Sequence, residues 1–299
     1  MLHLNQEGLE LMPYSLARRL VPLLTLGYGT LLFHGPLLAA NALPDTGQTT
    51  CYDGNQMVAC SPTNAGDASL YPGQDGRYGR DPASLLSIPR KMGGGSGGFD
   101  YTKLCNSGEA AGEGACPAEP QPGDQPDQWG CVRDNITGLM WEVKTWADND
   151  ADKGLRDGDW RYSWYDSNPN TNGGNPGQPD QGVGDNRDNC ADPERCDTEK
   201  YVQDVNAMPI ALCGYRDWRL PTARELQTLI NLGRINPVWE PAYFPNVPTN
   251  TFYWTATTRA SDPDQAWYIA SYNGRTYYYA KAFGYRIFSV RLVRGEALQ

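Results

Sequence analysis

The sequence predicts an α+β fold in which two helices pack on short antiparallel sheets, with long irregular loops and bracing by disulfides. Three observations lead to this prediction. Two segments have helical apolar periodicity, several short alternating runs follow them, and eight cysteines lie in a chain with 33 Gly and 23 Pro. Order is expected mainly after residue 128, because the sequence before it is Gly-, Pro- and Cys-rich.

Two helices are predicted in the second half of the chain. The first covers residues 199–212 and places four apolar side chains roughly on one face: Tyr201, Val202, Val205 and Met208. The second covers residues 222–232, because Thr222 followed by Glu225 is typical of a capping box. We expect Trp218, in the connector between the helices, to hold the fold and to contact no ligand.

Short strands account for most of the remaining pattern. They are predicted at residues 131–133, 139–143, 251–257, 266–272, 275–281 and 287–294. The first two flank the turn 134–138, and we interpret the Asn135-Ile136-Thr137 sequon inside it as a plain turn. Asn273-Gly274, between two alternating runs, indicates a hairpin with a two-residue loop.

The predicted hairpin defines the candidate binding surface. Its two-residue loop pairs Tyr272 with Arg275, and alternate residues then share one face of the sheet. That face carries the predicted ligand-binding residues Tyr268, Tyr272, Arg275, Tyr277, Tyr279 and Lys281. The opposite face, with Trp267 and Ile269, is better suited to the core. Exposed tyrosines with cations suit a polyhydroxylated or anionic ligand. Alternatively, the amino-terminal segment or an acidic insert covers them.

The acidic insert covers residues 148–199. It holds thirteen acidic and five basic residues, a net charge of −8 against −10 for the whole chain. Asp148, Asp150 and Asp152 resemble the start of a calcium loop, although Lys153 stands where such a loop needs glycine. The three aspartates are the candidate Ca²⁺ ligands, and a solvated acidic loop is the favoured alternative. Gln178-Pro179-Asp180 resembles a sugar-selecting tripeptide of some C-type lectins, but we interpret it as chance.

The first 42 residues are interpreted as a signal peptide. Arg18 and Arg19 precede a mostly apolar run at 20–38, and Ala40-Asn41-Ala42 is typical of a cleavage site. Prolines and glycines interrupt the run, so a membrane-spanning helix is not expected. The mature protein is expected to be extracytoplasmic, whether secreted, on the cell surface or in the periplasm. It would contain a wrapping segment, residues 43–127, and a domain, residues 128–295.

All eight cysteines follow the predicted cleavage site, so an exported chain should form four disulfides. Short loops favour the pairs Cys51–Cys60, Cys105–Cys116 and Cys190–Cys196, which leaves Cys131–Cys213 as the long-range bridge. Both histidines, His3 and His34, lie in the signal segment. Catalysis by a histidine base is therefore not expected in the mature protein, although a pair of carboxylates could still catalyse hydrolysis.

Four motifs together resemble the Lcl C-terminal domain family, a bacterial family named after the terminal domain of a collagen-like adhesin. They are residues 134–141, 217–222, 253–256 and 290–294. The resemblance covers roughly residues 128–295 without the insert. It implies a C-type-lectin-like fold and ligand binding or adhesion outside the cytoplasm. The founding member binds sulfated glycosaminoglycans as a trimer, but this chain has no collagen-like repeat. Its acidic insert would repel sulfated polymers unless it lies away from the basic face.

These observations favour an exported, non-catalytic binding or adhesion module that recognises a glycan, another surface polymer or a protein partner. A structural subunit of a surface filament or envelope complex, with oligomerisation, is the first alternative. The second is an enzyme, either similar to formylglycine-generating enzymes, which need reactive cysteines, or a carboxylate-pair glycosidase. Binding of nucleic acid is not expected, because the net charge is −10.

Overall fold

The structure, a computed structural model, describes residues 45–60, 73–88, 90–146, 154–180, 190–282 and 288–298. The predicted signal peptide, residues 1–42, lies outside these residues. The candidate calcium ligands Asp148, Asp150 and Asp152 lie outside them as well. Among the helices of the described part, none has the length and apolar character needed to cross a bilayer.

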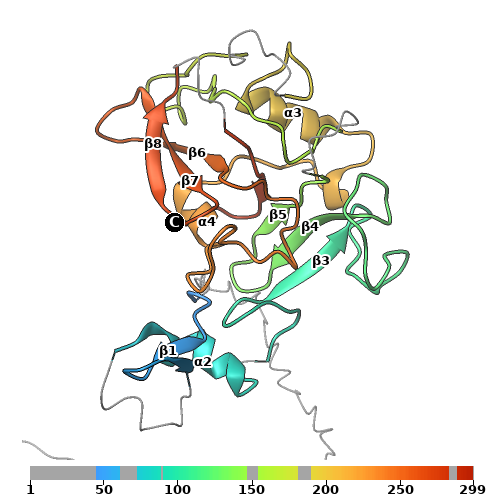
Figure 1. The fold of residues 1–299 in the computed structure, drawn as a ribbon. Helices are drawn as coiled ribbons and strands as arrows, with labels where there is room; N and C mark the ends of the chain where they lie inside the picture. The colour runs from blue at the N-terminus through green and yellow to red at the C-terminus, as the bar shows by residue number, and fades with distance from the viewer. Residues whose placement is uncertain are drawn as a thin grey trace, which may run out of the picture. The chain divides into compact units, whose positions relative to one another are not determined.

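A four-stranded antiparallel sheet forms one half of the framework (Figure 1). Its strand order is β3-β4-β5-β9, with β3 at Tyr101–Cys105, β4 at Trp129–Asp134, β5 at Met140–Glu142 and β9 at Val293–Arg294. The turn between β4 and β5 is held by Asp134, whose carboxylate accepts hydrogen bonds from Ile136 N (2.9 Å) and Thr137 Oγ1 (2.7 Å). The two strands and the turn predicted in this region are therefore confirmed.

A three-stranded antiparallel sheet, order β6-β7-β8, carries the predicted hairpin (Figure 1). Its strands are β6 at Phe252–Thr258, β7 at Gln265–Ala270 and β8 at Thr276–Ala280. Tyr268 lies opposite Tyr277, so the loop holds four residues and the predicted two-residue loop is wrong. Ser271 instead donates its N–H to Thr251 O and accepts from Val238 N, both at 2.8 Å. These contacts draw the chain out of the hairpin ladder before residue 272.

The two predicted helices are present but shorter. Helix α3 covers Thr198–Ala207, and Asp197 caps it by accepting from Lys200 N at 2.8 Å. It ends before Pro209, because a residue that precedes proline is disfavoured in the helical conformation. Helix α4 covers Ala223–Gln227 and begins with the predicted capping box. The chain leaves the helical path soon after it, where Asn231 N donates to Val238 O at 2.9 Å.

The predicted wrapping segment forms secondary structure of its own and also contributes a strand to the four-stranded sheet. Strands β1 (Thr50–Tyr52) and β2 (Met57–Ala59) form a hairpin, and helix α2 covers Arg80–Leu85. Phe99 is fully buried, whereas Tyr52 and Tyr78 are exposed. Because β3 pairs with β4, this segment supplies a strand of the four-stranded sheet.

At the other end of the chain, the strand predicted over residues 287–294 is reduced to β9. Among the described residues directly before it, 288–292, Phe288 forms an isolated bridge with Tyr162 and Ser289 forms one with Tyr253. These two bridges nevertheless tie the carboxy-terminal residues to the insert and to β6. The insert and the three-stranded sheet are thus joined through this segment.

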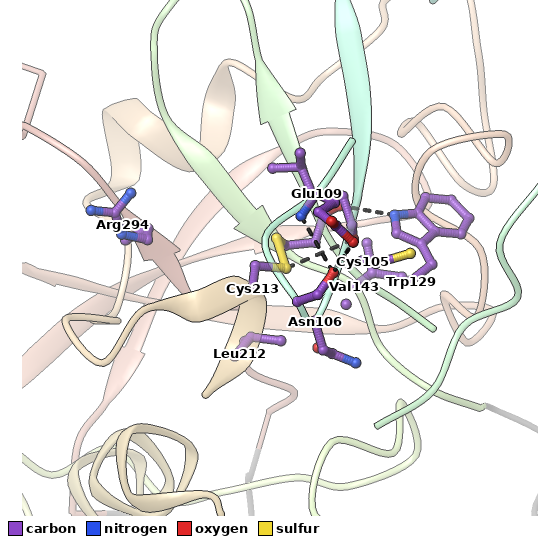
Figure 2. Close-up of a disulfide and its surroundings, with 12 residues drawn as sticks. Cys105, Asn106, Glu109, Trp129, Val143, Leu212, Cys213 and Arg294 are labelled. Atoms are coloured by element: carbon purple, nitrogen blue, oxygen red, sulfur yellow. Dashed lines mark hydrogen bonds between the residues drawn. A yellow bond between two sulfur atoms is a disulfide. The ribbon is translucent and has the colours of Figure 1, made fainter. Parts of the chain in front are cut away.

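All four predicted disulfides are present. They join Cys51 to Cys60, Cys105 to Cys116, Cys131 to Cys213 and Cys190 to Cys196. Figure 2 shows the surroundings of Cys213, which follows Leu212 in the connector. The indole N–H of Trp129 in β4 donates to Cys131 O at 2.9 Å. The Cys131–Cys213 bridge spans 82 residues of sequence and ties β4 to the connector that follows α3.

Candidate functional site

Much of the predicted tyrosine face of the hairpin packs against other aromatic side chains and is not open to solvent. Tyr268 is only 8 % exposed and packs with Trp164, Trp254 and Phe288. Trp254 and Phe288 approach it with ring-centroid distances of 6.1 Å and 4.5 Å. The prediction that all six residues of this face are open to a ligand is therefore wrong for Tyr268.

Lys281 is also buried. Its Nζ donates to Asn172 O (2.7 Å) and Thr258 Oγ1 (2.8 Å), and it lies 4.0 Å from the centre of the Trp164 ring. Burial lowers the pKa of Lys281 to about 8. Asn172 and Trp164 belong to the acidic insert, so at this end of the face the insert covers the hairpin, as the alternative interpretation proposed.

The other end of the face is accessible. Tyr272 and Tyr277, nearer the hairpin loop, are half-buried, and Arg275 is exposed. Tyr279 is half-buried too, but on β8 it lies toward Lys281. Arg275 donates from a guanidinium nitrogen to the Tyr277 hydroxyl at 3.3 Å. We call Tyr272, Arg275 and Tyr277 the open hairpin surface. The structure brings these three predicted residues together and separates them from Lys281.

Ring packing fixes the tyrosines of the open hairpin surface. Tyr277 stacks on Tyr268 with a centroid distance of 5.8 Å and an interplanar angle of 30°. Phe252 meets Tyr268 at 5.3 Å and Tyr272 at 5.9 Å, both edge to face. Sequence reasoning missed the role of Phe252. Its place two residues before Trp254 on one strand could have indicated that β6 backs the tyrosines.

The opposite face of the hairpin, predicted to enter the core, does so only in part. Ile269 is fully buried in the main core cluster, but Trp267 is half-buried. Tyr278 is 43 % exposed, and its ring lies 3.7 Å from the Arg259 guanidinium carbon. Near its middle, the hairpin thus has buried residues on both faces. For this reason, the residue types on one face did not predict which side chains are exposed to solvent.

Trp164 also lines an apolar cavity of about 380 Å³. Residues of the insert, α3 and the connector line it, among them Trp164, Val202, Arg219 and Leu220. Two carboxylates at its wall already have partners, since Glu199 accepts from Ser167 N at 2.6 Å and Asp166 from Thr171 Oγ1 at 2.6 Å. The cavity therefore offers room for an apolar group and few unused polar groups.

The connector between the helices is held by internal contacts of Trp218 and Arg219. Trp218 is buried, and its indole N–H donates to Leu212 O at 3.2 Å. Arg219 forms a bidentate pair with Glu225, at 2.8 Å and 2.7 Å. This pair helps to hold the pKa of Glu225 below its ordinary value despite burial, which acts in the opposite direction.

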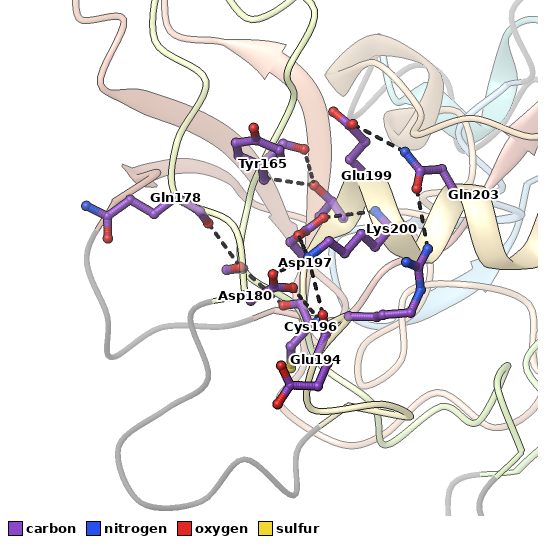
Figure 3. Close-up of polar contacts among 12 residues, drawn as sticks. Tyr165, Gln178, Asp180, Glu194, Cys196, Asp197, Glu199, Lys200 and Gln203 are labelled. Carbon is purple, nitrogen blue, oxygen red and sulfur yellow. Dashed lines mark hydrogen bonds and ion pairs between the residues drawn. The ribbon is translucent and has the colours of Figure 1, made fainter.

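The lectin-like tripeptide at residues 178–180 is also committed to internal contacts (Figure 3). Asp180 accepts from Cys196 N at 2.9 Å and forms an ion pair with Lys200. The same ammonium lies 3.6 Å from Asp197 and donates to Glu194 O at 3.2 Å. A lysine thus balances these carboxylates, and no described set of three or more His, Cys, Asp or Glu residues could hold a metal ion.

The model of the Lcl C-terminal domain family matches residues 130–294, which is more than half of the chain. The chain belongs to the Lcl C-terminal domain family. The matched region of this Lcl C-terminal domain includes most of β4, strands β5 to β9, helices α3 and α4 and the complete hairpin. No curated protein matches the chain. The resemblance predicted from the four motifs is therefore confirmed at the level of the family.

Proposed function

We propose that this member of the Lcl C-terminal domain family is an exported, non-catalytic binding module with a C-type-lectin-like fold. It recognises a glycan or another surface polymer through the open hairpin surface. The observation that carries the proposal is the combination of fixed, half-exposed tyrosine rings with an exposed arginine at the same end of one hairpin. Four disulfides are consistent with a place outside the cytoplasm.

The chemistry of this surface suits a sugar polymer that carries negative charge. Tyrosine rings stack on the apolar faces of sugar rings, and their hydroxyls exchange hydrogen bonds with sugar hydroxyls. The Arg275 guanidinium can bind a carboxylate or sulfate through two parallel hydrogen bonds. Because Tyr272 and Tyr277 are held by neighbouring rings, little conformational entropy is lost when a ligand binds.

The two alternatives make different demands on the molecule. An enzyme similar to formylglycine-generating enzymes needs reactive thiols, whereas all eight cysteines here are in disulfides. A structural subunit would bury the open hairpin surface against another chain. Light scattering of the purified mature protein separates this alternative from a free binding module, because a stable assembly would give the mass of several chains.

A glycan array that includes uronate-containing and sulfated polymers tests the proposal, followed by calorimetry with and without Ca²⁺. We expect binding to anionic polysaccharides that weakens as salt is raised, because an arginine contact with an anion is screened. We expect the same affinity with Ca²⁺ and with chelator at this surface, which holds no carboxylate. Failure to bind any saccharide or surface polymer would contradict the proposal.

A further inference from the structure

A further concave surface lies between residues 122–128 and Trp146, and no hairpin residue lines it. We call it the Trp146 groove. Its volume is about 280 Å³, and it is lined by Gly123, Asp124, Gln125, Gln128, Thr145 and Trp146. This volume lies just below the range of about 300–1000 Å³ that is typical of ligand sites, and it suits a single sugar ring.

Two buried side chains hold the loop that forms one wall of the groove. Asn106, 2 % exposed, donates its amide hydrogens to Gly123 O (2.8 Å) and Gln125 O (2.9 Å). Arg156, fully buried, donates to Gly123 O at 2.6 Å and to Asp124 Oδ1 at 2.8 Å. The backbone of the loop is therefore fixed before any ligand arrives, and its shape does not depend on the ligand.

The groups left facing the groove are those that recognise sugar hydroxyls. Trp146 is 51 % exposed, and the side chain of Asp124 is 37 % exposed. Gln128 uses its carbonyl oxygen to accept from Gln125 N at 3.0 Å, which leaves its NH₂ group for other partners. Thr145 is 3 % exposed, and its hydroxyl has no hydrogen-bond partner among the described residues. A buried hydroxyl without a partner is costly unless a ligand or water satisfies it.

From this arrangement we infer that the Trp146 groove binds a neutral sugar ring. The ring stacks on the exposed indole of Trp146, while Gln128 donates to one of its hydroxyls and Asp124 accepts from another. The Thr145 hydroxyl completes the contact at the floor. A neutral ligand is favoured because the Arg156 guanidinium is already satisfied by the loop, and the groove therefore offers no cation to an anionic sugar.

This inference does not depend on the open hairpin surface, and the two sites are distinguished by ligand charge and by mutation. Titration calorimetry of the mature protein with three neutral probes, cellohexaose, chitohexaose and maltohexaose, tests it. We expect one of the three to bind and Trp146→Ala to reduce its affinity at least about tenfold. Tyr278→Ala, which removes an exposed aromatic ring outside the Trp146 groove and outside the open hairpin surface, should leave that affinity unchanged.

A milder variant serves as a second test in case Trp146→Ala does not fold. Thr145→Val keeps the side-chain shape and removes only the hydroxyl, so we expect a smaller loss of affinity, about threefold to tenfold. Indole N–H resonances provide a direct readout, since the resonance that disappears in Trp146→Phe should be the one that shifts when the probe binds. The inference is overturned if none of the three probes binds, or if binding persists in folded Trp146→Ala.

Discussion

Three fully buried polar residues form a closed network in the main domain. Lys144 Nζ lies 3.0 Å from Glu142 Oε1 and donates to the Tyr201 hydroxyl at 2.5 Å, and Tyr201 donates to Glu142. The second oxygen of Glu142 accepts from Leu292 N at 2.9 Å. Burial alone would raise the pKa of Glu142, but Lys144 and Arg156 hold it below its ordinary value. Burial lowers the pKa of Lys144 to about 8.

Removing one charge of this network should lower the free energy of unfolding more than removing both charges. Lys144→Met removes the one cation that forms an ion pair with the buried Glu142 carboxylate, and we expect the free energy of unfolding to fall by about 3–5 kcal/mol. In the double variant Glu142→Leu, Lys144→Met, neither member of the ion pair is left without the other, so a large part of that loss should be recovered. Urea denaturation of the three proteins measures the difference. A double variant no more stable than the single one would contradict this account.

At the scale of elements, α4 depends on its first turn. Thr222 accepts from Glu225 N at 3.2 Å, and Glu225 accepts from Thr222 N at 2.8 Å. The helix has only five residues, so the cap satisfies a large share of its free backbone groups. The same carboxylate is held by Arg219, which ties the cap to the connector.

Thr222→Ala should therefore lower the free energy of unfolding by about 0.5–2 kcal/mol, the usual cost of losing a capping side chain. Thr249→Ala is the matched control, because Thr249 is exposed. We expect its effect to stay within about 0.5 kcal/mol. Thermal and urea denaturation measure both variants. Equal effects of the two substitutions would show that the cap does not stabilise the domain.

The hairpin shows how far local sequence predicts an element. Alternation correctly assigned Tyr268, Tyr277 and Tyr279 to one face, because the observed register differs from the predicted one by two residues and such a shift preserves the face. The loop length could not be predicted. It is set by Ser271, whose hydrogen bonds to Thr251 and Val238 depend on segments distant in sequence.

The solvent exposure of the hairpin side chains was predicted less well than the pairing of the cysteines. Lys281 and Tyr268 are buried because Trp164 and Asn172 of the insert fold back onto the hairpin. The insert is rich in Asp, Asn, Gly and Pro and has no periodicity that would indicate where it packs. The disulfides were predicted completely, because three of the four loops are short and the last pair followed by elimination.

For the whole molecule, buried tyrosines control stability in alkali. Burial raises the pKa of Tyr101, Tyr162 and Tyr201 well above the ordinary value of 10.0. The unfolded chain releases these protons near pH 10 and the folded protein holds them, so stability falls as pH rises further. The pKa values of Lys144 and Lys281 are lowered from 10.5 to about 8 in the folded protein. These two lysines therefore make stability rise with pH between about pH 8 and pH 10.5.

We therefore expect a net loss of unfolding free energy only above about pH 10.5, where the lysines no longer differ between the two states. Urea denaturation at a series of pH values measures it. Absorbance at 295 nm should also show fewer ionised tyrosines in the folded protein than in the urea-unfolded protein at the same alkaline pH. Identical titration curves for the two states would contradict the burial of these hydroxyls.

The claim that the open hairpin surface binds the ligand is tested most directly by one comparison. Biolayer interferometry would measure the affinity of the wild type, of the double variant Arg275→Ala, Tyr277→Ala, and of Tyr278→Ala for the strongest polymer on the array. The double variant should bind at least about a hundredfold more weakly, as expected when two central contacts are lost. Tyr278→Ala, on the opposite face of the same strand, should bind like the wild type. Wild-type affinity in the folded double variant would contradict the account.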